Sequence, residues 1–232
     1  LFPFQFSIRE YRPTDQYAAA VLFRDGILEH VYPAFFKAMS HPDHVGIALS
    51  VSMAGYVLGG SSYFQGLLFG SAWAGLIYYC CYDIYEGYML RRLGADMADI
   101  NATYLQNPDN GFWVAEADVG GQAKVLGMVA VTDGSYGELS HVVVAFPSRR
   151  KSVGSELMRK AMNFCKERGF SRLTLDLSSP QKAAMSMYQK LGFVQTASHS
   201  NTHANLLFSK LARITVTLNL CFHVPSSSKP NV

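Results

Sequence analysis

Residues 137–157 read GELSHVVVAFPSRRKSVGSEL, and this stretch decides the fold. Alternating apolar residues predict a strand over Gly137–Phe146, and Pro147–Ser152 forms a basic turn. A helix is predicted over Val153–Arg168, because apolar residues recur along one face and Gly169 can end it. The unit is therefore a strand, a basic turn and a helix.

The basic turn is a candidate anion site. A helix N-terminus offers unpaired N–H groups and a positive dipole end, which suit phosphate. Arg149, Arg150 and Lys151 add positive charge, while Ser152 and Gly154 keep the backbone accessible. Taken alone, the turn fits a phosphate site and a solvated basic surface equally well.

The flanking segments predict a mixed α/β domain. Ser7–Tyr11 alternates like a strand, Thr14 or Asp15 can cap a helix that follows, and Asp83–Leu105 is predicted to be helical with a break near Gly94. Further elements are two strands before the basic unit (Gly111–Ala117, Lys124–Asp133), a strand and a helix after it (Ser171–Leu177, Gln181–Leu191), and two last strands (Phe193–Thr196, Asn205–Leu211). The tail from Ile214 to Val224 alternates like a strand or lies against a membrane, and the residues after it are expected to be disordered.

A charge-free block runs from Val45 to Tyr82. A membrane-spanning helix needs about 20 apolar residues, and this block is nearly twice that length. Residues 59–62, Gly-Gly-Ser-Ser, are a natural break in its middle. If Ser7–Tyr11 joins the later sheet, both ends of the block lie on one side of the bilayer, which predicts a transmembrane helical hairpin. The alternative is a buried hairpin in a soluble core.

Composition limits the remaining function classes. Hydrophobic residues make up 49% and charged residues 16%, below the roughly 25% typical of soluble domains. The net charge of +3 implies no strong field for nucleic acid, so no nucleic-acid partner is expected. The four cysteines have the spacing of neither a zinc site nor a disulfide framework, and no metal is expected.

Two motifs, in this order, resemble the GNAT superfamily of acetyltransferases. Arg149, Ser152 and Gly154 occupy the fixed positions of its Gln/Arg-x-x-Gly-x-Gly/Ala turn, with serine in place of the first glycine. Residues 184–193, AMSMYQKLGF, match Ala-x-x-x-Tyr-x-x-x-Gly-Phe. The resemblance implies the GNAT fold: an α/β architecture with a mixed, mostly antiparallel central sheet flanked by helices, here with an inserted transmembrane hairpin.

The same resemblance implies acetyl-CoA as the cosubstrate and assigns its binding residues. Backbone N–H groups on the strand would bind the pantetheine arm, the basic turn would hold the phosphates, and the last helix would complete the site. The residues are Val142, Val143, Val144, Arg149, Arg150, Lys151, Ser152, Val153, Gly154, Ser155, Gln181 and Ala184.

Two catalytic residues are predicted for direct transfer of the acetyl group to an amine. Tyr188 matches the family's general acid, and a phenol can protonate a leaving thiolate. Glu138 is the predicted base, since some related enzymes carry a glutamate on this strand. The alternatives are Glu116, a chain of waters, and His141, which an unbroken strand would turn to the other face but a bulge would not.

A narrower resemblance, to the camello group of membrane-anchored acetyltransferases, covers nearly the whole chain. It rests on Phe23–His30, Ala95–Ile100 and Gly111–Glu116, and Phe222–Ser227 is more like the cysteine-S-conjugate branch than the aspartate branch. It implies a small amino-acid-derived amine, here a cysteine S-conjugate, with aspartate or protein lysine as alternatives. A non-catalytic CoA-binding membrane module is a further alternative, because of Ser152. The implied location is the endoplasmic reticulum membrane or the Golgi–ER intermediate, with a cytosolic catalytic domain.

The predicted organisation has four parts. The first strand and helix of the GNAT domain occupy residues 1–44, the membrane-embedded hairpin 45–82, the catalytic core 83–211, and a strand-like segment with a flexible tail 212–232.

Overall fold

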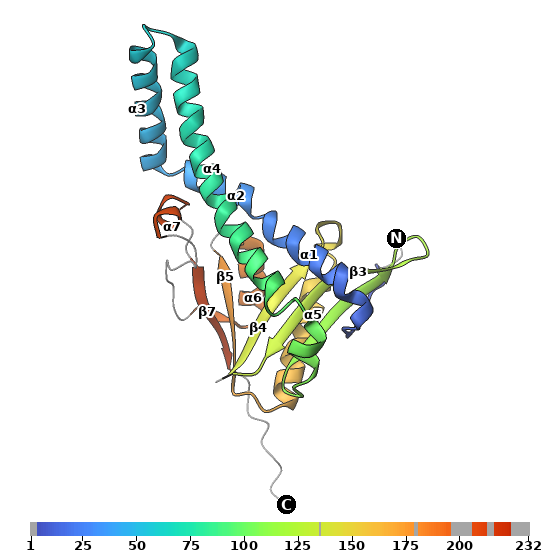
Figure 1. Cartoon of the computed structure of the whole chain (residues 1–232). Helices are drawn as coiled ribbons and strands as arrows, with labels where there is room; N and C mark the ends of the chain where they lie inside the picture. The colour runs from blue at the N-terminus through green and yellow to red at the C-terminus, as the bar shows by residue number, and fades with distance from the viewer. Residues whose placement is uncertain (1–3, 135, 179–180, 196–205, 213–215, 224–232) are drawn as a thin grey trace, which may run out of the picture.

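A computed structural model of the chain describes residues 4–134, 136–178, 181–195, 206–212 and 216–223. Its centre is one seven-stranded sheet with the order β1-β2-β3-β4-β5-β7-β6 (Figure 1). The strands are β1 (Ser7–Glu10), β2 (Gly111–Asp118), β3 (Ala123–Thr132), β4 (Gly137–Val144), β5 (Arg172–Ser178), β6 (Val194–Gln195) and β7 (Val216–His223). The predicted mixed, mostly antiparallel sheet is confirmed, because only β4 and β5 pair in parallel.

The pairing of β4 with β5 is short. Its register runs from Gly137 opposite Leu173 to Leu139 opposite Leu175, whereas β4 continues to Val144 and β5 to Ser178. Backbone polar groups on the β5 side of β4 therefore lose their strand partner beyond Leu139. We call the unpaired ends of these two strands, residues 140–144 and 176–178, the β4–β5 fork.

A β-bulge interrupts β4 at His141. Met128 pairs with Val143 and Ala130 pairs with Ser140, so one extra residue of β4 lies between these pairs. His141 has a φ of 52°, which non-glycine residues rarely adopt. The bulge re-aims the side chains that follow it.

Helices cover both faces of the sheet. On one face, α1 (Gln16–Leu28) and the C-terminal part of α4 (Tyr63–Gly94) enclose a cluster with Phe23, Phe112 and Met128. On the other face, α5 (Val153–Glu167) and α6 (Lys182–Lys190) pack on a cluster with Trp113, Leu157 and Leu173. The sheet thus lies between two apolar layers, with the fork at its centre.

The charge-free block forms an arm that projects from the domain (Figure 1). Helix α2 (Val31–Met39) leads into α3 (Pro42–Leu58), and the predicted break at 59–62 separates α3 from α4. The two arm helices approach closely, since a Cβ on Gly55 would lie 2.8 Å from Cγ of Phe69 and one on Gly66 would lie 3.1 Å from a carbonyl oxygen of Ser52. Small residues at such contacts are typical of helix pairs in membranes.

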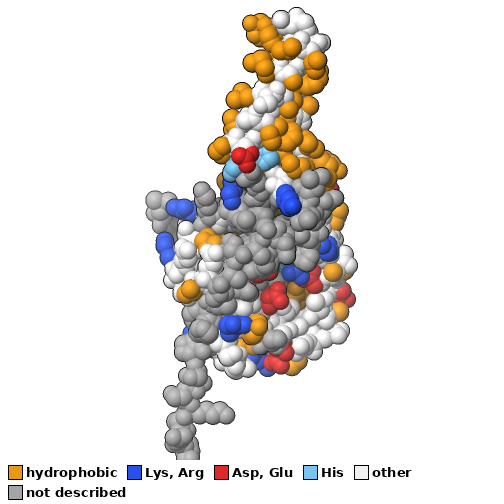
Figure 2. Space-filling view, turned by 90° about the vertical axis from the view of Figure 1, so that its left-hand side faces the viewer, with side chains coloured by type: hydrophobic (Ala, Val, Ile, Leu, Met, Phe, Trp, Pro, Cys, Tyr) orange, Lys and Arg blue, Asp and Glu red, His pale blue; other side chains and the backbone are white. Residues whose placement is uncertain are grey.

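Apolar side chains cover the outside of the arm (Figure 2). Exposed members include Leu49, Met53, Val57, Leu58, Phe64, Leu67 and Leu68. Within the described ranges, α4 is the one helix long and apolar enough to cross a membrane, judged by length and composition alone.

Two local predictions were wrong. Residues 206–212 form helix α7 rather than a strand, because Phe208, Leu211 and Ala212, at helical spacing, pack into a cluster with α2 and α4. Asp15 stands at the N-cap of α1, yet its carboxylate accepts hydrogen bonds from Arg9 and the Arg12 N–H instead of capping that helix. Strand β7 confirms the strand-like tail, while the segment predicted to be disordered lies outside the described residues.

Candidate active site

The fork lies beside the turn that enters α5. After β4, a short 3-10 helix (Phe146–Ser148) leads to the basic turn, and α5 begins at Val153 without a side-chain cap. The first N–H groups of α5 are therefore not satisfied by a cap. Arg150 and Ser152 have φ values of 62° and 64°, so the turn needs the left-handed conformation at both positions. Ser152 stands where the family turn has glycine, in a conformation that favours glycine.

Gly154 allows α5 to start close to its neighbours. A Cβ there would lie 3.2 Å from Sδ of Met187 on α6 and 3.5 Å from Cγ2 of Val144 on β4. On α5, Val153 is buried and Ser155 is half-buried, and Ala184 is half-buried on α6. The Nζ of Lys151 lies 4.2 Å from the ring centre of Phe4. The structure therefore brings the predicted residues at the end of β4, the start of α5 and α6 together beside the fork, whereas the Lys151 ammonium lies against Phe4, next to the edge strand β1.

The Arg149 side chain is engaged in contacts within the protein. Its Nε donates a 2.9 Å hydrogen bond to the carbonyl oxygen of Val144, and its Nη2 pairs with Glu29 at the C-terminal end of α1. The side chain also lies 5.4 Å from the Phe146 ring centre. Arg149 thus ties the end of β4 to the junction of α1 and α2.

Val143 faces α1 at a point of close approach. A Cβ on Gly26 would overlap Cγ1 of Val143, so glycine at this position lets α1 lie directly on β4. Val142 and Val144 are half-buried and contact the cluster on the opposite face. The sequence carries no direct signal for this approach, although Gly26 interrupts a helical pattern.

Tyr188 is buried on α6. Its ring packs edge-on to Phe193 with the centroids 5.8 Å apart, in the cluster shared with α5. Burial raises the pKa of the Tyr188 phenol, so it keeps its proton at neutral pH. A protonated phenol fits the predicted general acid, and its catalytic role stays a prediction.

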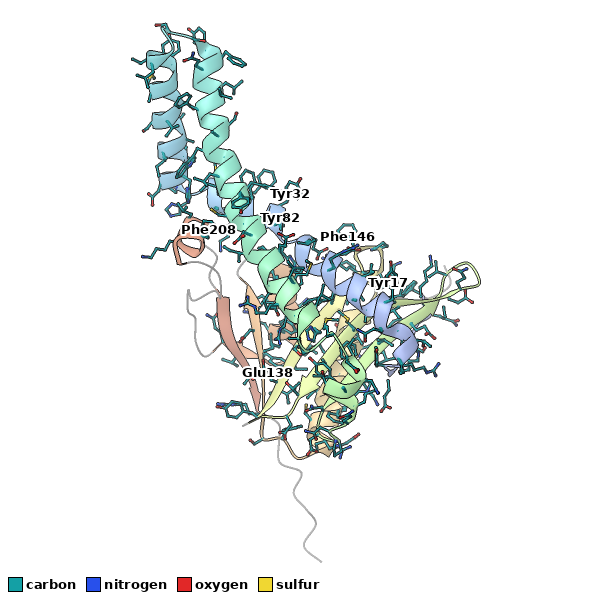
Figure 3. The ribbon with its side chains drawn as sticks, viewed as in Figure 1. Tyr17, Tyr32, Tyr82, Glu138, Phe146 and Phe208 are labelled. Carbon is teal, nitrogen blue, oxygen red and sulfur yellow. The ribbon has the colours of Figure 1, made fainter. Side chains whose placement is uncertain are left out.

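Two of the predicted bases lie away from the fork. Glu138 is exposed and pairs with Thr174 where β4 and β5 are still joined, at the end of β4 opposite to Phe146 (Figure 3). Glu116 on β2 accepts hydrogen bonds from Arg9, which also pairs with Asp15. This geometry gives neither carboxylate direct access to the fork, and the role of Glu138 stays a prediction.

His141, the third candidate, belongs to a sealed network. The bulge sends its imidazole into the cluster under α1, where it stacks edge-on against Phe23 with the centroids 5.0 Å apart. Its Nε2 is 2.7 Å from Oδ2 of Asp96, which also accepts bonds from Arg92 and Tyr104. Burial alone would raise the pKa of Asp96, but the hydrogen bond and charge of His141, with Arg92 and Tyr104, lower it to about 2. The His141 side chain has no exposed surface.

A second polar cluster, which the motifs did not predict, bridges the ends of both fork strands. Gln181, just after β5, is 2.8 Å from Nε2 of His30 through its amide nitrogen. His30 Nε2 is 3.9 Å from the Glu29 carboxylate that pairs with Arg149. The sequence pointed to this cluster only through the resemblance of Phe23–His30 to the camello group. Within the described residues, no three His, Cys, Asp or Glu side chains gather as a metal site.

Comparison with known proteins agrees with this architecture. The sequence pattern of the Acetyltransferase (GNAT) family matches residues 78–193. The protein named "Probable N-acetyltransferase camello" from Xenopus tropicalis is 30% identical over 196 residues, covering 81% of this chain and 85% of that protein. Human N-acetylaspartate synthetase is 30% identical over 189 residues, 80% of this chain and 61% of that protein. The Escherichia coli ribosomal-protein-S18-alanine N-acetyltransferase has the same fold, with a TM-score of 0.53 at 13% identity over 98% of this chain and 99% of that one.

The parallel pair that stops short, followed by a basic turn and α5, defines an acyl-transfer enzyme of the GNAT fold. The chain belongs to the Acetyltransferase (GNAT) family and is an N-acetyltransferase. The resemblance to the camello-like group predicted from the sequence is confirmed.

Proposed function

We propose that the enzyme transfers acetyl from acetyl-CoA to the amine of a small amino-acid-derived acceptor, a cysteine S-conjugate, at the endoplasmic reticulum membrane. The observation that carries the proposal is the fork: β4 backbone groups without a strand partner end at the uncapped N-terminus of α5. A phosphopantetheine arm needs both features, namely hydrogen-bonding backbone along its length and a cationic helix end for its phosphates.

The residues around the fork fit acetyl-CoA. N–H groups at Val142–Val144 would bind the pantetheine arm and polarise the thioester carbonyl. The first turn of α5, with Arg150 and Lys151, would hold the pyrophosphate, and the small Gly154 leaves its backbone approachable. Acetyl-CoA supplies the activated acetyl group when bound.

Tyr188 would donate the proton that the leaving sulfur needs. Its buried phenol stays protonated at neutral pH, so the proton is available when the C–S bond breaks. The thiols of Cys80, Cys81 and Cys165 are buried and free, which supports direct transfer to the amine over a covalent intermediate on any of these three residues.

The arm supports a membrane location. Both β1, before the arm, and β2, after it, lie in the same sheet, so the arm leaves and returns to the domain on one side. Its outer surface is apolar, and α4 has the length to span a bilayer. The endoplasmic reticulum, with the catalytic domain in the cytosol where acetyl-CoA is made available, follows from the camello resemblance.

Aspartate is the second candidate acceptor, favoured by the similarity to N-acetylaspartate synthetase. The test is CoA release by the detergent-solubilised protein with acetyl-CoA and, in parallel, S-benzyl-cysteine and aspartate. We expect saturable turnover with S-benzyl-cysteine. Turnover with aspartate alone would assign the other branch, and saturable acetyl-CoA binding without turnover on either would contradict both acceptors.

A further inference from the structure

The polar cluster at the end of the fork contains one imidazole, that of His30, to which the family motifs assign no role. His30 lies at the junction of α1 and α2, half-buried, with Glu29 and Arg149 on one side and Gln181 on the other. The ring of Tyr85 on α4 lies 6.1 Å from it, centroid to centroid. These side chains come from the C-terminal end of α1, the basic turn, α4 and the N-cap of α6.

The contact with Gln181 fits a neutral imidazole. An amide nitrogen donates hydrogen bonds and does not accept them, so in this orientation of the amide Nε2 of His30 accepts at 2.8 Å. The imidazole is then neutral, with its proton on Nδ1. The lone pair of Nε2 points at an N–H donor, which is the interaction that a base makes with an amine.

The cluster lies where the acceptor amine must arrive. Arg149 joins it to the carbonyl of Val144, the last residue of β4, and Gln181 joins it to the segment that follows β5. In sheets with parallel strands, ligands bind at the carboxyl ends of those strands. Glu138, by contrast, lies at the opposite end of β4, and His141 is sealed under α1.

We propose that His30 is the general base of the transfer: its Nε2 removes a proton from the acceptor ammonium group, which replaces the Gln181 amide as the donor. This inference rests on the proposed acetyl transfer and names a residue for which the family motifs make no assignment.

The proposed transfer conserves protons. His30 takes the first proton of the ammonium group and passes it to water, and Glu29 stabilises the imidazolium that forms in between. The nitrogen lone pair then forms the C–N bond as the C–S bond breaks, and Tyr188 protonates the sulfur. The second proton leaves the nitrogen as the amide forms and restores the Tyr188 phenol, so one proton in total is released.

The electrostatics suit this role. Burial lowers the pKa of the His30 imidazole; the negative charge of Glu29 opposes this shift and Arg149 adds to it. The neutral form therefore persists to lower pH than in an exposed histidine, and the base is available at neutral pH.

The test is the pH profile of kcat for His30→Gln, with acetyl-CoA affinity measured on the same full-length, detergent-solubilised protein and S-benzyl-cysteine as acceptor. Gln keeps a carbonyl that can accept the Gln181 hydrogen bond but cannot take up a proton. We expect kcat at pH 7.5 to fall about 100-fold, the low end of general-base effects. The deficit should shrink as the pH approaches the pKa of the amine, while the acetyl-CoA Kd changes less than twofold.

His41→Gln, which removes an imidazole at the start of α3, is the matched control and should retain wild-type kcat. A kcat for His30→Gln within threefold of wild type would overturn the proposal. So would an equal loss at every pH, or loss of acetyl-CoA binding, since either would make His30 a structural residue. A wild-type protein that binds acetyl-CoA but acetylates nothing would instead count against the proposed function itself.

Discussion

The protein contains two carboxylate–histidine pairs, and they differ in what surrounds them. Asp96 and His141 lie under α1, locked by Arg92 and Tyr104, with the imidazole cut off from solvent. Glu29 and His30 lie at the fork, partly open and joined to the cofactor turn through Arg149. Access to solvent therefore sets the chemistry of the same two residue types: the first pair is enclosed beside the bulge, whereas the second is open enough to exchange protons with a substrate.

Removing the hydroxyl of Tyr188, which is buried on α6, should have the largest effect on the transfer. Tyr188→Phe keeps the packing on Phe193 but cannot protonate the leaving sulfur. We expect kcat to fall by about 100-fold or more, with little change in acetyl-CoA binding. Tyr17→Phe, on the exposed face of α1 (Figure 3), is the control that should behave as wild type. An unchanged kcat in Tyr188→Phe would reduce Tyr188 to a packing residue.

At the buried Asp96–His141 pair, we expect a substitution to change stability. Asp96→Asn leaves the His141 network with a neutral, less complementary partner, and we expect a loss of about 2 kcal/mol in the free energy of unfolding. Because the pKa of Asp96 is lowered from 3.8 to about 2, its stabilisation is complete above pH 4 and is lost as the pH falls toward 2.

The stability difference between wild type and Asp96→Asn should therefore shrink across that acid range, as measured by urea unfolding. A difference that stayed constant from pH 6 to pH 2 would show that the charge of Asp96 contributes nothing to folding.

Arg149 belongs to the open pair, because it contacts both the end of β4 and Glu29. Arg149→Ala should raise the KM for acetyl-CoA about tenfold, equivalent to about 1.4 kcal/mol, by removing a cation from the turn. Arg159→Ala, on the exposed side of α5, is the matched control. Identical acetyl-CoA kinetics in Arg149→Ala would remove Arg149 from the cofactor site.

The smallest effect is expected at Ser152. Its left-handed conformation costs a non-glycine residue roughly 1 kcal/mol, so Ser152→Gly should raise the free energy of unfolding by about that amount and lower the KM for acetyl-CoA. Ser155→Gly, in the first turn of α5, should instead lower stability, by roughly 0.5 to 1 kcal/mol. Destabilisation by Ser152→Gly would show that serine makes a contact that the turn needs.

The sequence predicted the elements that local patterns determine. Alternation located β1 to β5, and the basic turn with Gly154 located the start of α5. It did not predict the bulge, because a positive φ at His141 has no signature in a residue that is not glycine. It did not predict the His30 cluster either, since Arg149 and Gln181 are 120 and 151 residues from their partners Glu29 and His30.

The error at 205–211 has the same origin. Alternation and helical spacing overlap in so short an apolar run, and packing against α2 and α4 decides between them. Local pattern therefore fixes elements, whereas contacts between distant segments fix the chemistry of the site.

Hydrogen exchange with and without acetyl-CoA tests most directly whether the fork is the cofactor site. Binding should slow exchange at residues 140–155 and 181–188 and leave the Asp96–Leu105 segment unchanged. Protection confined to the Asp96–Leu105 segment, or no protection at saturating acetyl-CoA, would contradict the assignment of the fork as the cofactor site.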